Sequence, residues 1–218
     1  MMLVIADILS KAEVAAICAV AEGMAFGDGK STAGAIARRV KANDQALPSA
    51  DLEAIRGKVS TALLAHPVLV SAARPRALTP QILSRYQRGQ SYGLHVDDAL
   101  MSGIRADLSY TLFLGDPESY AGGALVIADS AEERAFKLKA GDLILYPSTT
   151  LHRVEPVTDG TRLAMVGWLQ SWVKAADERE ILFDLDRAIA SLGAAEDERA
   201  LGALLGKTRS NLIRKWAD

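Results

Sequence analysis

The stretch from about Arg76 to Val173 constrains the fold more than any other part of the chain. It contains eight short runs of β-forming residues, separated by turn residues at nearly regular spacing. The runs are ALTPQILSRYQRG, SYGLHVD, ADLSYTLFLG, GALVIAD, RAFKLKAGD, LILYPS, TTLHRVEPV and TRLAMVGWLQSWV. No pattern of helical length interrupts them, so a parallel sheet of alternating strands and helices is disfavoured. The pattern predicts a mainly β core, folded as an antiparallel sandwich, barrel or jelly roll.

Helical patterns precede this region. Ser10 followed by Glu13 is a capping-box pattern, which predicts a helix over residues 11–22. A second helix is expected to begin at about residue 50 and to end at His66, because Pro67 follows. His66 is therefore interpreted as a residue at the end of a helix, and a role as a metal ligand is the less favoured alternative.

Helical periodicity returns after the strand region. Apolar residues at positions 181, 185, 189 and 192 predict a helix capped by Asp177 and ended by Gly193, and residues 197–216 predict a final helix. The chain is thus expected to have three regions. They are an N-terminal helical region that packs on the core (1–75), the β core (76–174) and a C-terminal helical extension (175–218).

Composition excludes several kinds of partner. The net charge of the 218 residues is −2 with both signs mixed along the chain, so neither a nucleic-acid surface nor an acidic tail is indicated. No segment offers about 18 uninterrupted apolar residues, which a membrane helix needs, and the N-terminus lacks the basic region of a signal peptide. The single cysteine, Cys18, has no partner for an internal disulfide. We expect a cytoplasmic protein that binds neither nucleic acid nor a membrane.

Two of the three histidines indicate a metal site. His95 forms an H-x-D pattern with Asp97, a weak indication alone because about 0.2 such matches are expected by chance. His152 lies on a later predicted strand, where alternation places it on the same face as Val154. Two histidines and one carboxylate on a β scaffold form the facial triad of non-haem Fe(II) oxygenases. Taken singly, each histidine is more often a packed core or surface residue, and Asp98 is expected to face solvent.

Arg162 is the next candidate, ten residues after His152. On a plain hairpin it would face Val157, roughly 16 Å from His152 along the strand. Pro156 argues against regular pairing, so the chain is expected to cross to the facing sheet, as consecutive jelly-roll strands often do. Alternation makes Arg162 the only charge on an apolar, inward face. Its expected partner is a carboxylate brought by a ligand.

The segments RYQRGQSYGLHVD, GGALVI and GDLILYPSTTLHRVEPVTDGTR resemble the prolyl/lysyl-hydroxylase-like branch of the Fe(II)/2-oxoglutarate dioxygenases. The chain is similar to the bacterial PKHD-type hydroxylases over nearly its whole length. This resemblance implies a double-stranded β-helix, or jelly-roll, core with flanking helices. It implies that His95, Asp97 and His152 bind iron, that Arg162 anchors the distal carboxylate of 2-oxoglutarate, and that Tyr86 lines the cosubstrate pocket.

The resemblance also implies an activity. The expected reaction hydroxylates an unidentified primary substrate, either a peptidyl residue or a small molecule, with decarboxylation of 2-oxoglutarate to succinate. The implied cofactors are Fe(2+), 2-oxoglutarate and dioxygen, with L-ascorbate (vitamin C) as a further candidate. A link to iron uptake and a homodimer formed through the C-terminal helices are hypotheses. Two alternatives stay open, a non-redox cupin-like metalloenzyme and a non-catalytic sensor of iron or 2-oxoglutarate.

Overall fold

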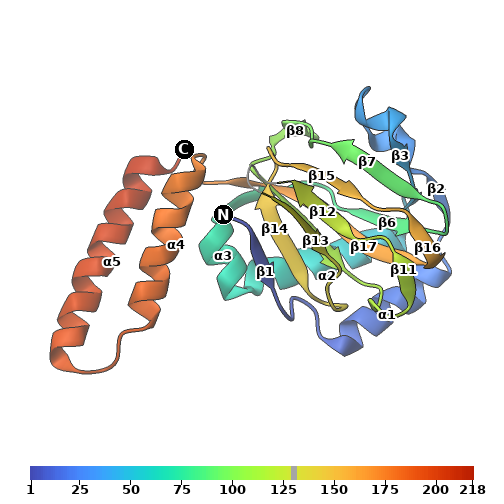
Figure 1. Cartoon of the computed structure of the whole chain (residues 1–218). Coiled ribbons are helices and arrows are strands. Elements are labelled where there is room, and N and C mark those ends of the chain that lie inside the picture. Colours follow the sequence, from blue (N-terminus) through green and yellow to red (C-terminus); the bar gives the residue numbers. More distant parts are fainter. Residues whose placement is uncertain (129–131) are drawn as a thin grey trace.

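Two antiparallel sheets, built mainly from the predicted strand region, form the core of the protein (Figure 1). The structure is a computed structural model that describes residues 1–128 and 132–218. Within these residues the larger sheet runs in the order β1 (Leu3–Ile5), β14 (Leu143–Pro147), β10 (Leu108–Phe113), β17 (Arg162–Ser171), β6 (Ile82–Tyr86), β4 (Asp44–Ala46) and β2 (Phe26–Asp28), with β5 (Pro75–Leu78) paired to β17. The smaller sheet runs in the order β13 (Glu133–Phe136), β12 (Leu125–Ala128), β15 (Leu151–Val154), β7 (Ser91–His95) and β3 (Lys41–Ala42).

Two short strand pairs lie outside the sheets. They are β8 (Leu100–Met101) with β9 (Ile104–Arg105), and β11 (Tyr120–Gly122) with β16 (Val157–Gly160). The predicted run GALVIAD corresponds to β12, although its last residue, Asp129, lies outside the described residues.

The core strands alternate between the two sheets along the chain. Strands β6, β10, β14 and β17 lie in the larger sheet, and β7, β12 and β15, which fall between them in sequence, lie in the smaller one. This alternation is the double-stranded β-helix that the resemblance implies, and that prediction is confirmed. It also places residues of successive strands on opposite walls of one interior.

Strand alternation divides the apolar residues into two clusters. On β14, Leu143 and Leu145 face one cluster, which the larger sheet shares with helices α1 (Lys11–Glu22), α2 (Ala50–Ala65) and α3 (Pro67–Ala73). Ile144 and Tyr146 face the other cluster, which also contains residues of β12 and β15 and so fills the space between the sheets. The helices therefore cover the outer face of the larger sheet, and the interior between the sheets is left for the site.

The N-terminal helices agree with the sequence pattern in part. Helix α1 has the predicted capping box, with Ser10 and Glu13 bonded reciprocally. Helix α2 ends before His66 as expected, but Pro67 also begins α3, because proline fits the first position of a helix, where its missing N–H is not needed. Helix α3 is not predicted from the sequence. Nor are the four short strands, β1 to β4, that this region adds to the sheets.

The C-terminal extension is a hairpin of α4 (Ala176–Ala190) and α5 (Glu196–Trp216), which stands beside the core (Figure 1). Ala175, and not the predicted Asp177, occupies the N-cap of α4, and Asp177 lies in its first turn. Asp186 of α4 fixes the hairpin, because it accepts hydrogen bonds from Ser71 of α3, from Arg74 at the C-cap of α3 and from Arg209 of α5. No described helix is long and apolar enough to cross a membrane.

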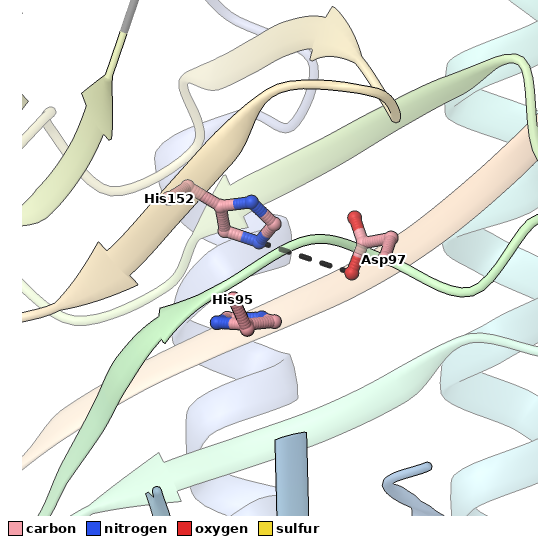
Figure 2. A group of neighbouring side chains, drawn as sticks. All are labelled: His95, Asp97 and His152. Carbon is pink, nitrogen blue, oxygen red and sulfur yellow. Dashed lines mark ion pairs between the residues drawn. The ribbon is translucent and has the colours of Figure 1, made fainter. Parts of the chain in front are cut away.

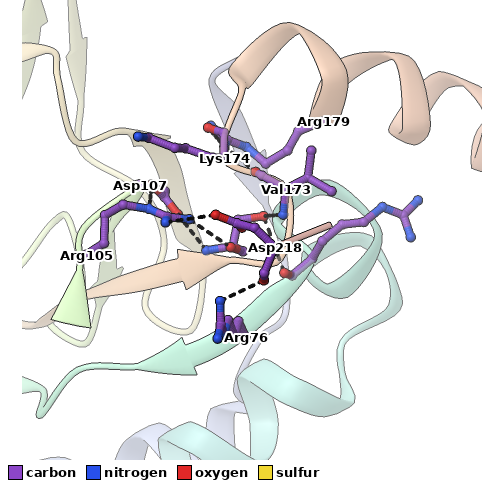
Figure 3. A network of polar contacts seen from close by, with 9 residues as sticks. Arg76, Arg105, Asp107, Val173, Lys174, Arg179 and Asp218 are labelled. Atoms are coloured by element: carbon purple, nitrogen blue, oxygen red, sulfur yellow. Dashed lines mark hydrogen bonds and ion pairs between the residues drawn. The ribbon is translucent and has the colours of Figure 1, made fainter. Parts of the chain in front are cut away.

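The end of the chain returns to the core (Figure 3). The main-chain oxygen of Asp218 accepts a hydrogen bond from Nη1 of Arg76 at 2.7 Å. Its side-chain oxygen Oδ2 lies 3.3 Å from Nη1 of Arg105. Arg105 also pairs with Asp107 at 2.8 Å. At the start of α4, buried Arg179 donates hydrogen bonds to two main-chain carbonyls. These contacts attach both ends of the hairpin to the strand region.

Candidate metal centre and cosubstrate pocket

The structure brings together the three residues that the sequence predicts as metal ligands. His95 ends β7, Asp97 follows two residues later, and His152 lies on β15, directly opposite His95 in the pairing of the two strands. One ligand atom from each residue lies within 4.8 Å of the others. Figure 2 shows Nε2 of His152 directed toward Asp97, whose Oδ1 is 3.8 Å away. All three side chains line one pocket, and Asp98, which is exposed as predicted, lies at the border of the same pocket.

Main-chain carbonyls orient both histidines. Nδ1 of His95 donates to the carbonyl oxygen of Gly93 at 2.9 Å, and Nδ1 of His152 donates to that of Thr150 at 3.0 Å. A carbonyl oxygen can only accept, so each Nδ1 carries a proton and Nε2 is the atom of each ring that is left to face a metal. Burial, aided by nearby His152, lowers the pKa of His95 to about 4. Neutral His95 is therefore ready to coordinate a metal through Nε2.

Two serines hold the carboxylate of Asp97. Oγ of Ser109 donates to Oδ2 of Asp97 at 2.6 Å, and Oγ of Ser148 lies 2.8 Å from Oγ of Ser109. Since Ser109 has one hydroxyl proton, Ser148 is the donor in the second bond. Oδ1 of Asp97 stays directed toward His152. Neither serine is predicted from the sequence, although Ser109 within the largely apolar run ADLSYTLFLG was a usable signal.

Arg162 lies on the opposite wall of the interior. After β15 the chain leaves the smaller sheet and reaches β17 of the larger one, so the predicted crossing is confirmed. The side chain of Arg162 is 1% exposed, and within the described part of the chain its Nε and Nη1 have no hydrogen-bond partner. The guanidinium lies 5.2 Å from the ring centre of Tyr86 and 5.3 Å from that of Phe113. A buried cation with unused donors fits an anionic ligand.

Gly123 allows the chain to pass close to this arginine. Its φ is +66°, a left-handed conformation that glycine adopts readily. A Cβ at this position would lie 3.2 Å from Cδ of Arg162 and 2.9 Å from Val157. The predicted GGALVI motif therefore contributes a close contact beside the arginine.

One pocket connects the triad with Arg162. Tyr86 lines it and pairs with Arg162 across β6 and β17. Burial raises the pKa of Tyr86 to about 12, so its phenol stays protonated. On the other side of the pocket, Tyr92 stacks on His95 with ring centres 3.6 Å apart. The predicted site residues thus line a single pocket, with His66 outside it.

The pocket has a further polar wall that the sequence analysis missed. It is formed by Thr32, Lys41, Asn43 and Gln45, which belong to the region expected to be helical. Burial lowers the pKa of Lys41 to about 8, while Asp97 and Asp28 act in the opposite direction. Nothing in the local pattern of this region separates these residues from an ordinary loop. Their position follows only from the pairing of β3 with β7.

The donor set suits a catalytic iron. Two imidazoles and one carboxylate match the composition that binds non-haem Fe(II) and leaves coordination positions open. Arg162 lies in the same pocket, and its Nε and Nη1 have no hydrogen-bond partner among the described residues, so it suits a cosubstrate with a carboxylate at some distance from the metal. The site thus fits both groups that the oxygenase reaction requires.

Family models and a solved structure together define the class of protein. Residues 82–170 match the family model of the 2OG-Fe(II) oxygenase superfamily, and residues 177–218 match that of the PKHD-type hydroxylase C-terminal domain. A prolyl-4-hydroxylase from Pseudomonas putida has a similar fold, with a TM-score of 0.56 and 18% identity over 78% of this chain and 92% of that one. The architecture is therefore that of the 2OG-Fe(II) oxygenases.

Full-length relatives then define the family. A PKHD-type hydroxylase of Maricaulis maris (strain MCS10) is 50% identical over 193 residues, 88% of each chain. Another, from Acaryochloris marina (strain MBIC 11017), is 45% identical over 219 residues, the whole of both chains. The chain belongs to the PKHD-type hydroxylases, and it is an Fe(II)- and 2-oxoglutarate-dependent dioxygenase.

Proposed function

We propose that this dioxygenase hydroxylates its primary substrate with Fe(II) held by His95, Asp97 and His152 and with 2-oxoglutarate anchored by Arg162. The observation that carries the proposal is the combination found in one pocket. Three ligand atoms lie within 4.8 Å of one another, and a buried guanidinium with unused donors faces the same space. Tyr86, which borders Arg162, is the proposed second contact for the cosubstrate.

The bound Fe(II) would supply the open coordination positions at which 2-oxoglutarate and dioxygen react. Residues of the chain would bind the cosubstrate, orient the metal ligands and exclude water. Arg162 would neutralise the distal carboxylate of 2-oxoglutarate, and the protonated phenol of Tyr86 would lie beside it. Ser109, supported by Ser148, would keep Asp97 fixed by occupying its Oδ2. The apolar residues between the sheets would exclude water from the pocket.

The overall reaction follows from these roles. 2-Oxoglutarate would lose carbon dioxide and take up one atom of dioxygen to become succinate, and the other oxygen atom would enter a C–H bond of the substrate as a hydroxyl group. Either a peptidyl residue or a small molecule remains a candidate substrate. A link to iron uptake, dependence on L-ascorbate, a cytoplasmic location, a homodimer and the division into regions 1–75, 76–174 and 175–218 stay predictions of this proposal.

The test is succinate formation from 2-oxoglutarate under air, with and without added Fe(II). We expect Fe(II)-dependent succinate from the wild type and none when His95, Asp97 or His152 is replaced by Ala. A non-redox cupin-like metalloenzyme would not consume 2-oxoglutarate, and a sensor would bind it without producing succinate. Membership of the PKHD-type hydroxylases leaves both alternatives without a supporting observation. Succinate formed equally well without Fe(II), or by the triad variants, would contradict the proposal.

A further inference from the structure

One wall of the pocket is a segment that we name the strap, residues 29–46. Its strand β3 pairs with β7 beside the triad, with Lys41 opposite Tyr92. The amide of Gly93 donates to the carbonyl oxygen of Val40 at 2.8 Å. A Cβ on Gly93 would lie 2.8 Å from Cβ of Val40, so glycine lets the strap approach this closely. The strap therefore reaches the side of the metal centre that Tyr92 and His95 form.

Lys41 is a buried cation on this wall. It is 6% exposed, and its Nζ donates to Oγ1 of Thr32 at 3.1 Å and lies 5.0 Å from the ring centre of Tyr92. No carboxylate of residues 1–128 or 132–218 pairs with it within 4.0 Å. An ammonium has three N–H donors, and Thr32 uses one. Lys41 thus has donors to spare inside the pocket.

Asn43 adds a second unused group. It is 2% exposed and lines the same pocket beside the hydroxyl of Tyr86, and neither its Nδ2 nor its Oδ1 forms a hydrogen bond of normal geometry within the described part of the chain. By contrast, Gln45 accepts a hydrogen bond from Thr32 at 2.9 Å. Lys41, which is cationic, and Asn43, which carries an amide, therefore both present polar atoms with unused hydrogen-bonding capacity to the pocket.

A structural role, in which residue 41 holds the strap in place through Thr32, does not explain why this residue carries a charge. A neutral donor would satisfy the hydroxyl of Thr32 as well, without the cost of burying an ammonium whose hydrogen-bond partner is neutral and which Asp97 and Asp28 stabilise only from beyond ion-pair distance. An anionic group brought by a ligand would compensate this cost. The distal carboxylate of 2-oxoglutarate already has a proposed partner in Arg162, which lies on the other sheet. The ligand that remains is the primary substrate.

We propose that Lys41 and Asn43 form a subsite that binds a carboxylate of the primary substrate, close to the carbon that is hydroxylated. This inference rests on the proposed function and narrows its substrate class. A monoanionic carboxylate suits the subsite better than a doubly charged phosphate, because Asp97 and Asp98 border the same pocket. A cationic lysyl side chain would be repelled by Lys41.

Acetate and its neutral isostere acetamide are the probes for this subsite. The full-length protein is loaded with Mn(II) in place of Fe(II) and saturated with 2-oxoglutarate, and broadening of each probe's methyl proton signal by the metal is followed by NMR. We expect the wild type to bind acetate at least about 10-fold more tightly than acetamide, the lower limit for one charged hydrogen bond. Lys41→Met should abolish the preference and Lys41→Arg should retain it. Lys30→Met, which removes an exposed charge of the strap, is the matched control and should behave as wild type.

Three results would overturn the subsite. They are equal broadening by both probes in the wild type, an acetate preference that survives Lys41→Met, and a loss of more than about 10-fold in 2-oxoglutarate affinity in that variant, which would place Lys41 in the cosubstrate site. The wild-type comparison of the two probes decides the question even where Lys41→Met unfolds. Failure of the wild type to bind Mn(II) or 2-oxoglutarate at all would contradict the proposed function as well, so the two failures are distinguishable.

Discussion

Replacing Arg162 by Lys tests the cosubstrate site most sharply. The guanidinium has at least two unused nitrogen donors, Nε and Nη1, in a pocket that it shares with the triad. Lysine keeps the positive charge but loses the planar fork that contacts both oxygens of a carboxylate. Loss of one charged hydrogen bond costs about 1.5–3 kcal/mol, or about a 10- to 150-fold weaker affinity for 2-oxoglutarate. Metal affinity should change little, because the triad residues are untouched.

The assay is an anaerobic titration of Fe(II)-loaded protein with 2-oxoglutarate, followed by the visible charge-transfer band. Arg153→Lys is the matched control, because Arg153 is adjacent to His152 in sequence but pairs with Glu133 at the surface. Unchanged affinity in Arg162→Lys, with the band still formed, would remove Arg162 from the site. An equal loss in the control would show that the effect is not specific to the pocket.

A second substitution at position 162 should weaken 2-oxoglutarate binding and yet leave the stability of the ligand-free protein unchanged or increased. Without ligand, Arg162 is a buried charge whose donors are not fully paired, and replacing such a charge by an apolar residue is often neutral or stabilising. Arg162→Met should therefore unfold in urea at the same or a higher midpoint than the wild type when ligand is absent. It should also lose the stabilisation that 2-oxoglutarate confers on the wild type. A marked fall in the midpoint without ligand would mean that Arg162 has a structural partner.

Four further predictions concern the triad and the helices. Asp97→Ala should abolish Fe(II) binding and Asp98→Ala should retain it, as equilibrium dialysis would measure. Ser109→Ala should weaken Fe(II) affinity by about 10- to 100-fold, because Asp97 loses its hydroxyl donor. The free energy of unfolding of the metal-free protein should fall as the pH is lowered from 6.5 toward about 4, because His95 takes up a proton in the unfolded chain before it does so in the folded one. Urea titrations at several pH values would measure this fall, and His95→Asn should make the free energy of unfolding less dependent on pH in that range. Removing α5, which has no buried residue, should lower the melting temperature by only about 2–4 °C, whereas removing α4 as well should give insoluble protein.

Residue patterns were sufficient wherever a side chain's direction follows from its own strand. Alternation placed His152 and Arg162 inside, and Pro156 indicated that the chain would change sheets between them, as it does. The pairing of β7 with β15, which sets His95 opposite His152, is a long-range contact that no local pattern contains. The chemistry of a facial triad grouped the two histidines, and the resemblance supported that grouping, but neither gives the strand pairing that brings them together.

The N-terminal region shows why the remainder could not be predicted. Strands β1 to β4 are two or three residues long, too short for a period of two to be recognised. They form because the edges of the two sheets offer main-chain partners, and this is a tertiary effect. Lys41 consequently cannot be assigned to the pocket from the sequence, because its position depends on the pairing of β3 with β7. The helix after Pro67 was missed because proline was interpreted only as a stop signal.

The central claim is that this pocket couples the consumption of 2-oxoglutarate to dioxygen at the triad. The most direct test incubates Fe(II)-loaded protein with 2-oxoglutarate under 18O2 and determines the mass of the succinate. In the dioxygenase reaction one atom of dioxygen enters the new carboxylate of succinate, so labelled succinate is expected from the wild type and none from Asp97→Ala. Succinate that carries no label, or label that persists in Asp97→Ala, would contradict the account.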